Sequence, residues 1–154
     1  MYLSEICKIV NGMPPHSTDG GLAGVAAYVN MENYTHITMI VQQGVGAAST
    51  ITVEKDANGS GAGTAIAFNY RMCNTAYQAA LGDLLGEATA AGVGGIATGT
   101  TDNSFMVIEL DSDVLGAGYP YVRAAASAVA GVIGIVYILS GARYKETSDT
   151  VLSV

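Results

Sequence analysis

Hydrophobic and polar residues alternate along several short segments of this chain, which is the period-two pattern of half-buried β-strands. Residues 50–54 alternate cleanly, and residues 65–71 do so again. The turn-rich residues 56–63 lie between these two segments and predict a hairpin. Further strands are predicted for residues 34–43, 104–110, 121–128 and 132–140.

The longest uncharged run, residues 124–142, fits two different structures. Its nineteen residues lie between Arg123 and Arg143 and nearly match the length of a membrane-spanning helix. They also match the end of one strand, a turn and a second strand. The many β-branched residues, and Gly131 and Gly134 at turn or bulge positions, favour the two strands.

The number and spacing of these segments predict an all-β fold, an antiparallel and jelly-roll-like β-sandwich of about seven to nine strands. Residues 74–99 break the pattern, since glycines weaken a helix there, and predict an irregular or partly helical insertion. Alternation also predicts the core. The residues expected to face inward are Ile66, Phe68, Met106, Ile108, Ile135 and Tyr137.

The chain ends fall outside the strand pattern. Pro14 and Pro15, with glycine, asparagine and aspartate around them, exclude a helix and predict a loop. We therefore expect an N-terminal arm at 1–21, a β-sandwich domain at 22–144 and a C-terminal tail at 145–154.

Composition narrows the function classes. Half of the 154 residues are hydrophobic and only 12% are charged. A surface with so little charge is predicted to serve as an interface. Alternatively, the many glycine and alanine residues simply fill the core. A net charge of −7 argues against nucleic-acid binding. Cys7 and Cys73 form no disulfide framework, and the start lacks a signal-peptide pattern, so we expect a cytosol-made chain with reduced thiols.

Two histidines invite catalytic or metal-binding interpretations. His16, Ser17 and Asp19 are the residue types of a nucleophilic triad, but triad members converge from separate elements, so a polar loop is the prediction. His36 has no second ligand at metal-binding spacing and is predicted to be a structural histidine with its hydrogen bonds satisfied.

Glu109, Asp111 and Asp113 form the densest carboxylate cluster. If an EF-hand loop started at Asp111, its bidentate glutamate would fall at Val122, so the EF-hand match fails. Weak calcium binding by carboxylates from several loops is the alternative. The glycine runs at 59–63 and 92–95 lack a phosphate-binding lysine, so they are predicted turns. Residues 33–35 and 58–60 match the glycosylation pattern by chance. We predict no catalytic, cofactor or metal site, and no enzyme.

Five segments carry a resemblance to a known family. They are MENYTHITMIVQQG at 31–44, TITVEKDANGSGAGTAIAFNYRMCN at 50–74, SFMVIELDSDVL at 104–115, YPYVRAAAS at 119–127 and VYILSGARY at 136–144. In this order they resemble the small decoration or cement proteins of tailed-bacteriophage virions, which are encoded with the head genes. Residues 74–99 are longer and richer in alanine than the family pattern, and residues 1–21 carry no match.

The resemblance implies an all-β structural protein that binds the outside of an assembled capsid at capsomer junctions and cements it. Its implied partner is the major capsid protein, and it implies a homo-oligomer, a dimer or trimer, on the capsid surface. The protein would be made in the bacterial cytoplasm and would end on the outer surface of the virion, with no membrane partner. Its acidity disfavours a place beside packaged DNA.

Other functions compete with this one. A phage tail or connector component fits the same sequence features. A membrane-anchored protein would use residues 124–142 as its span. A carbohydrate-binding sandwich is disfavoured because the chain has no Trp, whose flat face stacks best on sugars.

Overall fold

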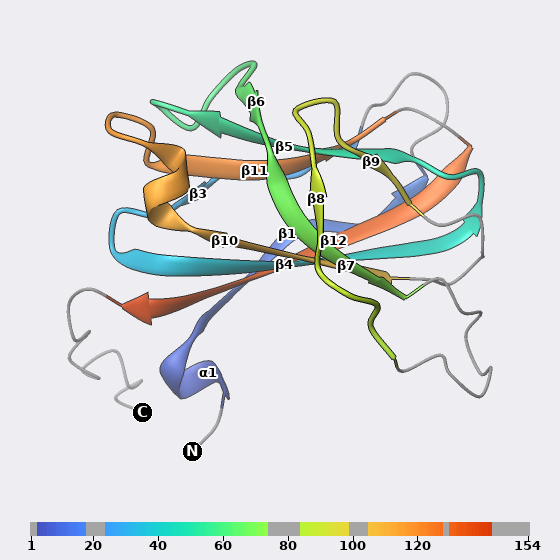
Figure 1. The fold of residues 1–154 in the computed structure, drawn as a ribbon, viewed down its shortest axis with the longest axis horizontal. Coiled ribbons are helices and arrows are strands. Elements are labelled where there is room, and N and C mark those ends of the chain that lie inside the picture. The colour runs from blue at the N-terminus through green and yellow to red at the C-terminus, as the bar shows by residue number, and fades with distance from the viewer. Residues whose placement is uncertain (1–2, 18–23, 74–83, 99–104, 128–129, 143–154) are drawn as a thin grey trace, which may run out of the picture.

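Two antiparallel sheets lie face to face and enclose the hydrophobic core (Figure 1). The computed structural model describes residues 3–17, 24–73, 84–98, 105–127 and 130–142. Sheet A runs in the order β1 (Lys8–Ser17), β12 (Gly131–Ala142), β4 (Tyr34–Gly46), β10 (Phe105–Asp111), β7 (Phe68–Cys73) and β8 (Thr89–Ala91).

Sheet B is built around two strands of similar length. Its order is β2 (Gly24–Val25), β11 (Tyr121–Ala126), β5 (Thr50–Asp56) and β6 (Thr64–Ile66), with β3 (Val29–Asn30) beside β11 and β9 (Ile96–Ala97) beside β5. The helices of the described chain are α1 (Leu3–Ile6) and the 3₁₀ turn η1 (Ser112–Leu115).

The predicted antiparallel β-sandwich is confirmed. Strands β1, β4, β5, β7, β10, β11 and β12 have six or more residues each, which makes seven strands of substantial length. The other five described strands have two or three residues and explain why the total exceeds the predicted seven to nine.

The uncharged run at 124–142 contains the end of β11 and all of β12, so the two-strand prediction is confirmed. The alternative of one membrane-spanning helix over these residues is wrong. Gly131 starts β12 beside Gly46, and the register shifts before Ile133, as expected for a bulge. Within the described ranges, no helix is long and apolar enough to cross a membrane.

The predicted hairpin is present as β5 and β6, in which Val53 pairs with Ile66. The second segment does not continue as one strand, because the chain crosses at Ala67 from sheet B to sheet A. Ile66 and Phe68 are therefore buried from opposite sheets.

The prediction of a loop around Pro14 and Pro15 is wrong. Residues 8–17 form β1, an edge strand of sheet A that pairs with β12. Register shifts on both sides of Met13 accommodate the prolines, and an edge strand tolerates proline because its outer amides need no ladder partner. Met13 is buried in the core, so this part of the predicted arm belongs to the sheet.

The predicted insertion at 74–99 is extended where it is described. Residues 84–98 contain β8 and β9 and no helix. Residues 74–83, where a short helix was predicted, lie outside the described residues, as does the predicted tail at 145–154.

All six residues predicted to face inward are buried. The core they share contains the aliphatic, aromatic and methionine side chains of both sheets. Tyr137 also joins the layers through its hydroxyl, which accepts a 3.0 Å hydrogen bond from the Ala124 N–H in the opposite sheet.

Candidate binding surfaces

Of the three triad-like residues near residue 16, the structure describes His16 and Ser17, which lie in β1. His16 lies on the exposed side of β1, and its Nδ1 is 2.9 Å from the Pro14 carbonyl oxygen. None of the ion pairs within the described ranges involves His16. Asp19 falls outside the described residues. Among the residues that the structure describes, His16 therefore has no ion-paired carboxylate of the kind that orients a catalytic base.

His36 has the hydrogen-bond partner that was predicted, and pairing of β4 with β10 provides it. Asp111 is opposite His36 in the register, and its Oδ1 lies 2.8 Å from His36 Nδ1. Glu109 Oε1 is farther away, 3.8 Å from Nε2. Sequence spacing missed this cluster because 75 residues separate the partners. In the part of the chain that the structure describes, no group of three or more such side chains could hold a metal ion.

The remaining motif residues serve turns or the core. Asp113 lies in η1, and its carbonyl accepts the Gly116 N–H, while Val122 is buried, so no EF-hand forms. In the β5–β6 turn, Asp56 Oδ2 accepts hydrogen bonds from the backbone amides of Ser60 and Asn58. These hydrogen bonds hold the pKa of Asp56 below its ordinary value.

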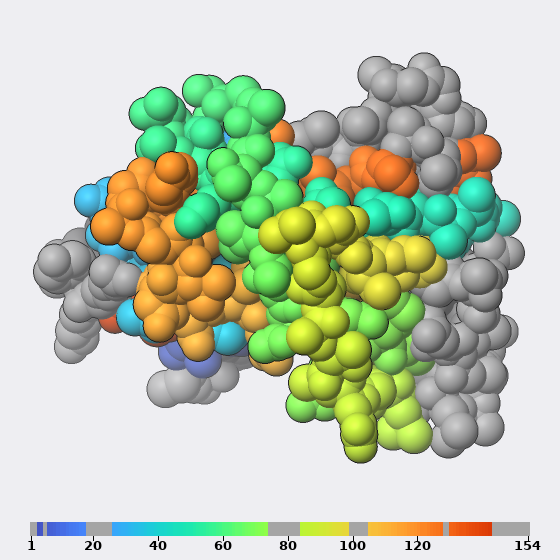
Figure 2. All heavy atoms as spheres, turned by 45° about the horizontal axis from the view of Figure 1, so that its top comes forward, coloured from blue at the N-terminus to red at the C-terminus, as the bar shows by residue number. Residues whose placement is uncertain are grey.

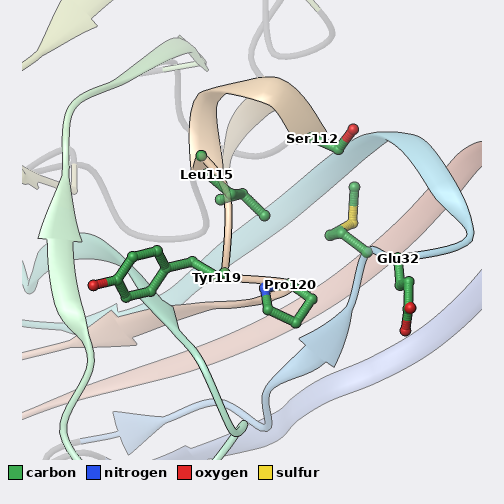
Figure 3. Close-up of a pocket in the computed structure, with 8 residues that line it drawn as sticks. Glu32, Ser112, Leu115, Tyr119 and Pro120 are labelled. Atoms are coloured by element: carbon green, nitrogen blue, oxygen red, sulfur yellow. The ribbon is translucent and has the colours of Figure 1, made fainter.

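Three loops form a pocket of about 340 Å³ at one end of the sandwich (Figure 3). We call it the loop-end pocket. It is lined by Met31, Glu32, Ser112, Leu115, Gly116, Gly118, Tyr119 and Pro120. These residues come from the β3–β4 turn, from η1 and from the loop that leads into β11.

Hydrogen bonds hold the walls of the loop-end pocket in place. The Met31 N–H donates to the Pro120 carbonyl at 2.8 Å and joins two of the loops. Lys55 Nζ donates to the Leu115 carbonyl at 2.7 Å and also lies 4.5 Å from the centre of the Tyr119 ring. The pocket is therefore formed before any partner binds.

The loop-end pocket is lined by both apolar and polar groups. Met31 and Leu115 are buried, whereas Figure 3 shows Ser112 and Glu32 at the margin. Tyr119, which lines the pocket, is 39% exposed. Such a site fits an apolar side chain of a partner protein. Sequence analysis missed it because its lining comes from separate segments.

The segment from η1 to β11 is on the surface of the molecule. Figure 2 shows it in orange at one end, beside the green loop of the β5–β6 hairpin. Gly116 and Gly118 both have left-handed backbone conformations, with φ of 74° and 84°. Glycine adopts these angles without strain, so the loop can turn back tightly toward Pro120.

The outer face of sheet A carries apolar side chains on its central strands, with the polar Thr38, Gln42 and Glu109 among them. Side chains on this face alternate with the buried ones, and Val136, Ile40 and Val107 are neighbours across β12, β4 and β10. We call the half-buried or exposed apolar side chains of this face the apolar stripe. It consists of Ile9, Ile40, Phe105, Val107, Val132, Val136 and Ile138.

Helix α1 extends the apolar surface of sheet A beyond the strands. Leu3 and Ile6 are 51% and 53% exposed, and Ile9 at the start of β1 is 50% exposed. Ile9 pairs with Ile138, so it connects α1 with the apolar stripe. Figure 1 shows α1 on the side of sheet A that faces away from sheet B.

The outer face of sheet B has a different character, because its own side chains bind one another. Arg123 Nη2 lies 2.7 Å from Glu54 Oε2, and its guanidinium lies 4.2 Å from the centre of the Tyr28 ring. The side chains of Arg123 and Glu54 are only 14% and 22% exposed. This face therefore offers few apolar groups to a partner.

No protein family matches the sequence, and no curated protein is significantly similar to it. A solved structure that aligns with this one is that of the SPBc2 prophage-derived protein YomS. The two chains are 14% identical, and the alignment covers 88% of this chain and 93% of the other, with a TM-score of 0.49. A likeness at this level carries no argument about function, so the proposals below rest on the chain's own residues.

Proposed function

We propose that this protein is a structural virion protein that binds the outside of an assembled phage capsid at capsomer junctions and stabilises the shell. The proposal starts from the resemblance of five sequence segments to capsid cement proteins. The observed all-β sandwich agrees with the fold that this resemblance implies. The proposal assigns the protein no enzymatic activity.

The loop-end pocket is the structural observation that carries the proposal. Hydrogen bonds hold its walls in place, and Tyr119 in its lining is exposed. Protein–protein interfaces concentrate their binding free energy in such pockets and in tyrosine side chains around them. We place the contact with the major capsid protein here.

Multivalent contact explains how a small protein can stabilise a shell. A protein that touches two capsomers gains the second contact at a high effective concentration, so weak contacts add to a strong one. Free capsid subunits offer one contact at a time. Binding to the assembled shell in preference to its parts must also stabilise that shell.

Binding of labelled protein to expanded capsids and to unassembled capsid subunits tests the proposal. We expect high occupancy on capsids and weak binding to free subunits. Tyr119→Lys should weaken capsid binding at least about tenfold, because it removes an aromatic side chain from the pocket lining and places a charge there. Val93→Lys, which places a lysine at a 61% exposed valine in the β8–β9 turn, is the control and should bind like the wild type.

Three outcomes would contradict the proposal. Label confined to phage tails would assign the protein to the tail or connector. Equal affinity for free subunits and assembled capsids would remove the multivalent mechanism. Equal losses in Tyr119→Lys and Val93→Lys would show that the loop-end pocket is not the contact site.

A further inference from the structure

We propose that Asn58, in the β5–β6 turn, is a site of spontaneous chemical modification at which the asparagine converts to aspartate and isoaspartate. It is followed by Gly59, and the sequence has one other Asn-Gly pair, Asn11 and Gly12. The fold leaves the first pair open to the reaction and protects the second. This inference concerns the turn and does not depend on the proposed function.

An Asn-Gly pair is reactive because the glycine amide nitrogen can attack the carbonyl carbon of the asparagine side chain, Cγ. The new N–C bond closes a succinimide ring while the Cγ–Nδ2 bond breaks, and the side-chain nitrogen leaves as ammonia with the proton of the glycine amide. Water then opens either carbonyl of the ring and gives aspartate or isoaspartate. Glycine favours ring closure because it has no Cβ in the way and its backbone rotates freely.

The β5–β6 turn leaves Asn58 open to this reaction. Asn58 is exposed, and residues 57–63 belong to no strand. Gly59 has a left-handed backbone conformation, with φ of 69°. Because this pair lies outside the ladders of both sheets, no hydrogen bonds between strands have to break before the ring closes.

The hydrogen bonds within the turn hold the attacking nitrogen only weakly. Asp56 Oδ2 accepts the amides of Asn58 and Ser60, at 2.9 and 3.0 Å. These two amides contribute most to the lowered pKa of Asp56, and the amide of Gly59 contributes less. The group that must attack is therefore not the one that anchors the turn.

Strand β1 holds Asn11 and Gly12 much more firmly. Asn11 is paired with Val136 of β12, and the Gly12 carbonyl accepts the Ala27 N–H at 2.9 Å. Gly12 is buried, and a Cβ there would lie 2.6 Å from the ring of Tyr137, so its backbone has no space to rotate. Ring closure at Asn11 therefore requires β1 to detach from sheet A first.

Conversion at Asn58 would alter the turn around it. Isoaspartate carries the main chain through its side chain, which inserts an extra backbone atom between Asp56 and Ser60. The Ser60 amide would then no longer meet Asp56 Oδ2 in the same geometry. Gly59 lies against Tyr121, where a Cβ would come within 2.6 Å of the ring, so the change would also reach the start of β11.

Peptide mapping by mass spectrometry tests the inference, on the full chain incubated in mildly alkaline buffer. The products are recognised by the gain in mass when a carboxylate replaces an amide, and chromatography separates isoaspartate from aspartate. We expect the product at Asn58 to form at least about tenfold faster than the product at Asn11. In urea, where β1 and the turn are both unfolded, the two sites should react at similar rates, because the dipeptide is the same.

Asn58→Gln is the matched control, since the longer side chain of glutamine closes the corresponding ring much more slowly. It keeps an exposed amide in the turn and should leave the circular dichroism spectrum unchanged. This variant should give almost no product at position 58, while the slow reaction at Asn11 continues at its wild-type rate.

Two results would overturn the inference. Equal rates at Asn58 and Asn11 in the folded chain would show that the fold does not distinguish the two pairs. A folded chain in which Asn58 stays intact, although it reacts in urea, would show that the turn protects Asn58 as β1 protects Asn11. Neither measurement involves a capsid, so both results leave the proposed function in place.

Discussion

Tyr137 shows how much a single side chain contributes at the residue scale. Its ring is fully buried, and its hydroxyl oxygen is the acceptor for the Ala124 N–H across the sandwich. Burial raises the pKa of Tyr137 well above its ordinary value, so the hydroxyl stays neutral at any pH the protein meets.

Tyr137→Phe should lower the free energy of unfolding by about 1–3 kcal/mol, because it leaves a buried backbone N–H without its acceptor. Urea denaturation would measure the change. Tyr70→Phe removes a hydroxyl from a half-buried tyrosine of β7 and serves as the control, with an expected change within about 0.5 kcal/mol. Equal effects of the two variants would mean that the bond between the sheets contributes nothing.

Gln43 is a polar residue in an apolar place. It is 2% exposed, lies opposite Ile133 on β4, and neither atom of its amide has a hydrogen-bond partner in the described chain. Gln43→Met keeps the length of the side chain and removes the unpaired groups. It should raise the free energy of unfolding by about 1 kcal/mol, measured by urea denaturation. Destabilisation by a similar amount would show that the amide binds a buried water.

Alternation along the sequence was sufficient to identify individual core residues, but not their polar partners. Phe68 and Ile108 could be predicted as inward-facing because each lies in a segment of period two. The contact between His36 and Asp111 could not, because it depends on the register between β4 and β10. Register is set by the packing of the whole sheet, which local spacing does not contain.

At the element scale, β1 is where sequence and structure differ most. Two adjacent prolines predict a loop, since proline cannot donate a ladder hydrogen bond. The strand forms nonetheless because it lies at the edge of sheet A and shifts register around Met13. The edge position comes from the tertiary fold, so no local pattern could predict it.

Gly12→Ala should detach or distort β1. A Cβ at this position would lie 2.6 Å from the Tyr137 ring, too close for either group to stay in place. The expected loss is about 1–3 kcal/mol of unfolding free energy, as for other overpacked sites. Gly92→Ala is the control, because a Cβ there meets nothing within 4 Å. An unchanged stability of Gly12→Ala would mean that β1 packs less closely on β12.

The β5–β6 turn should respond to acid through Asp56. Its pKa is lowered by backbone hydrogen bonds from Ser60 and Asn58, so the carboxylate stabilises the turn above the unfolded-state pKa. This contribution should disappear as the pH falls through the lower pKa of the folded state. Amide chemical shifts of Asn58 and Ser60 should titrate together at a pH below 3.8. Titration at or above that value would refute the account of the turn.

At the scale of the whole molecule, the chain has two unlike surfaces available for partners. The loop-end pocket is a small cavity between three loops, and the apolar stripe and α1 lie on the outer side of sheet A.

The sandwich as a whole could be predicted from the number and spacing of its strands, but its topology could not. The crossing at Ala67, which separates β6 from β7, falls inside one uninterrupted pattern of alternation. The loop-end pocket was equally hidden, because Met31 and Leu115 meet only after both sheets have formed. Alternation shows on which face of a strand a residue lies, but it does not show which of the two sheets that strand joins.

Heat-induced release of DNA from decorated and stripped phage particles tests the central claim most directly. Labelled protein would report occupancy on each particle. If the protein cements the shell, stripped particles should release DNA at a lower temperature, and adding back the wild type should restore the original temperature. Tyr119→Lys should restore it only in part. High occupancy with an unchanged release temperature would contradict the claim and would leave a protein that covers the capsid without stabilising it.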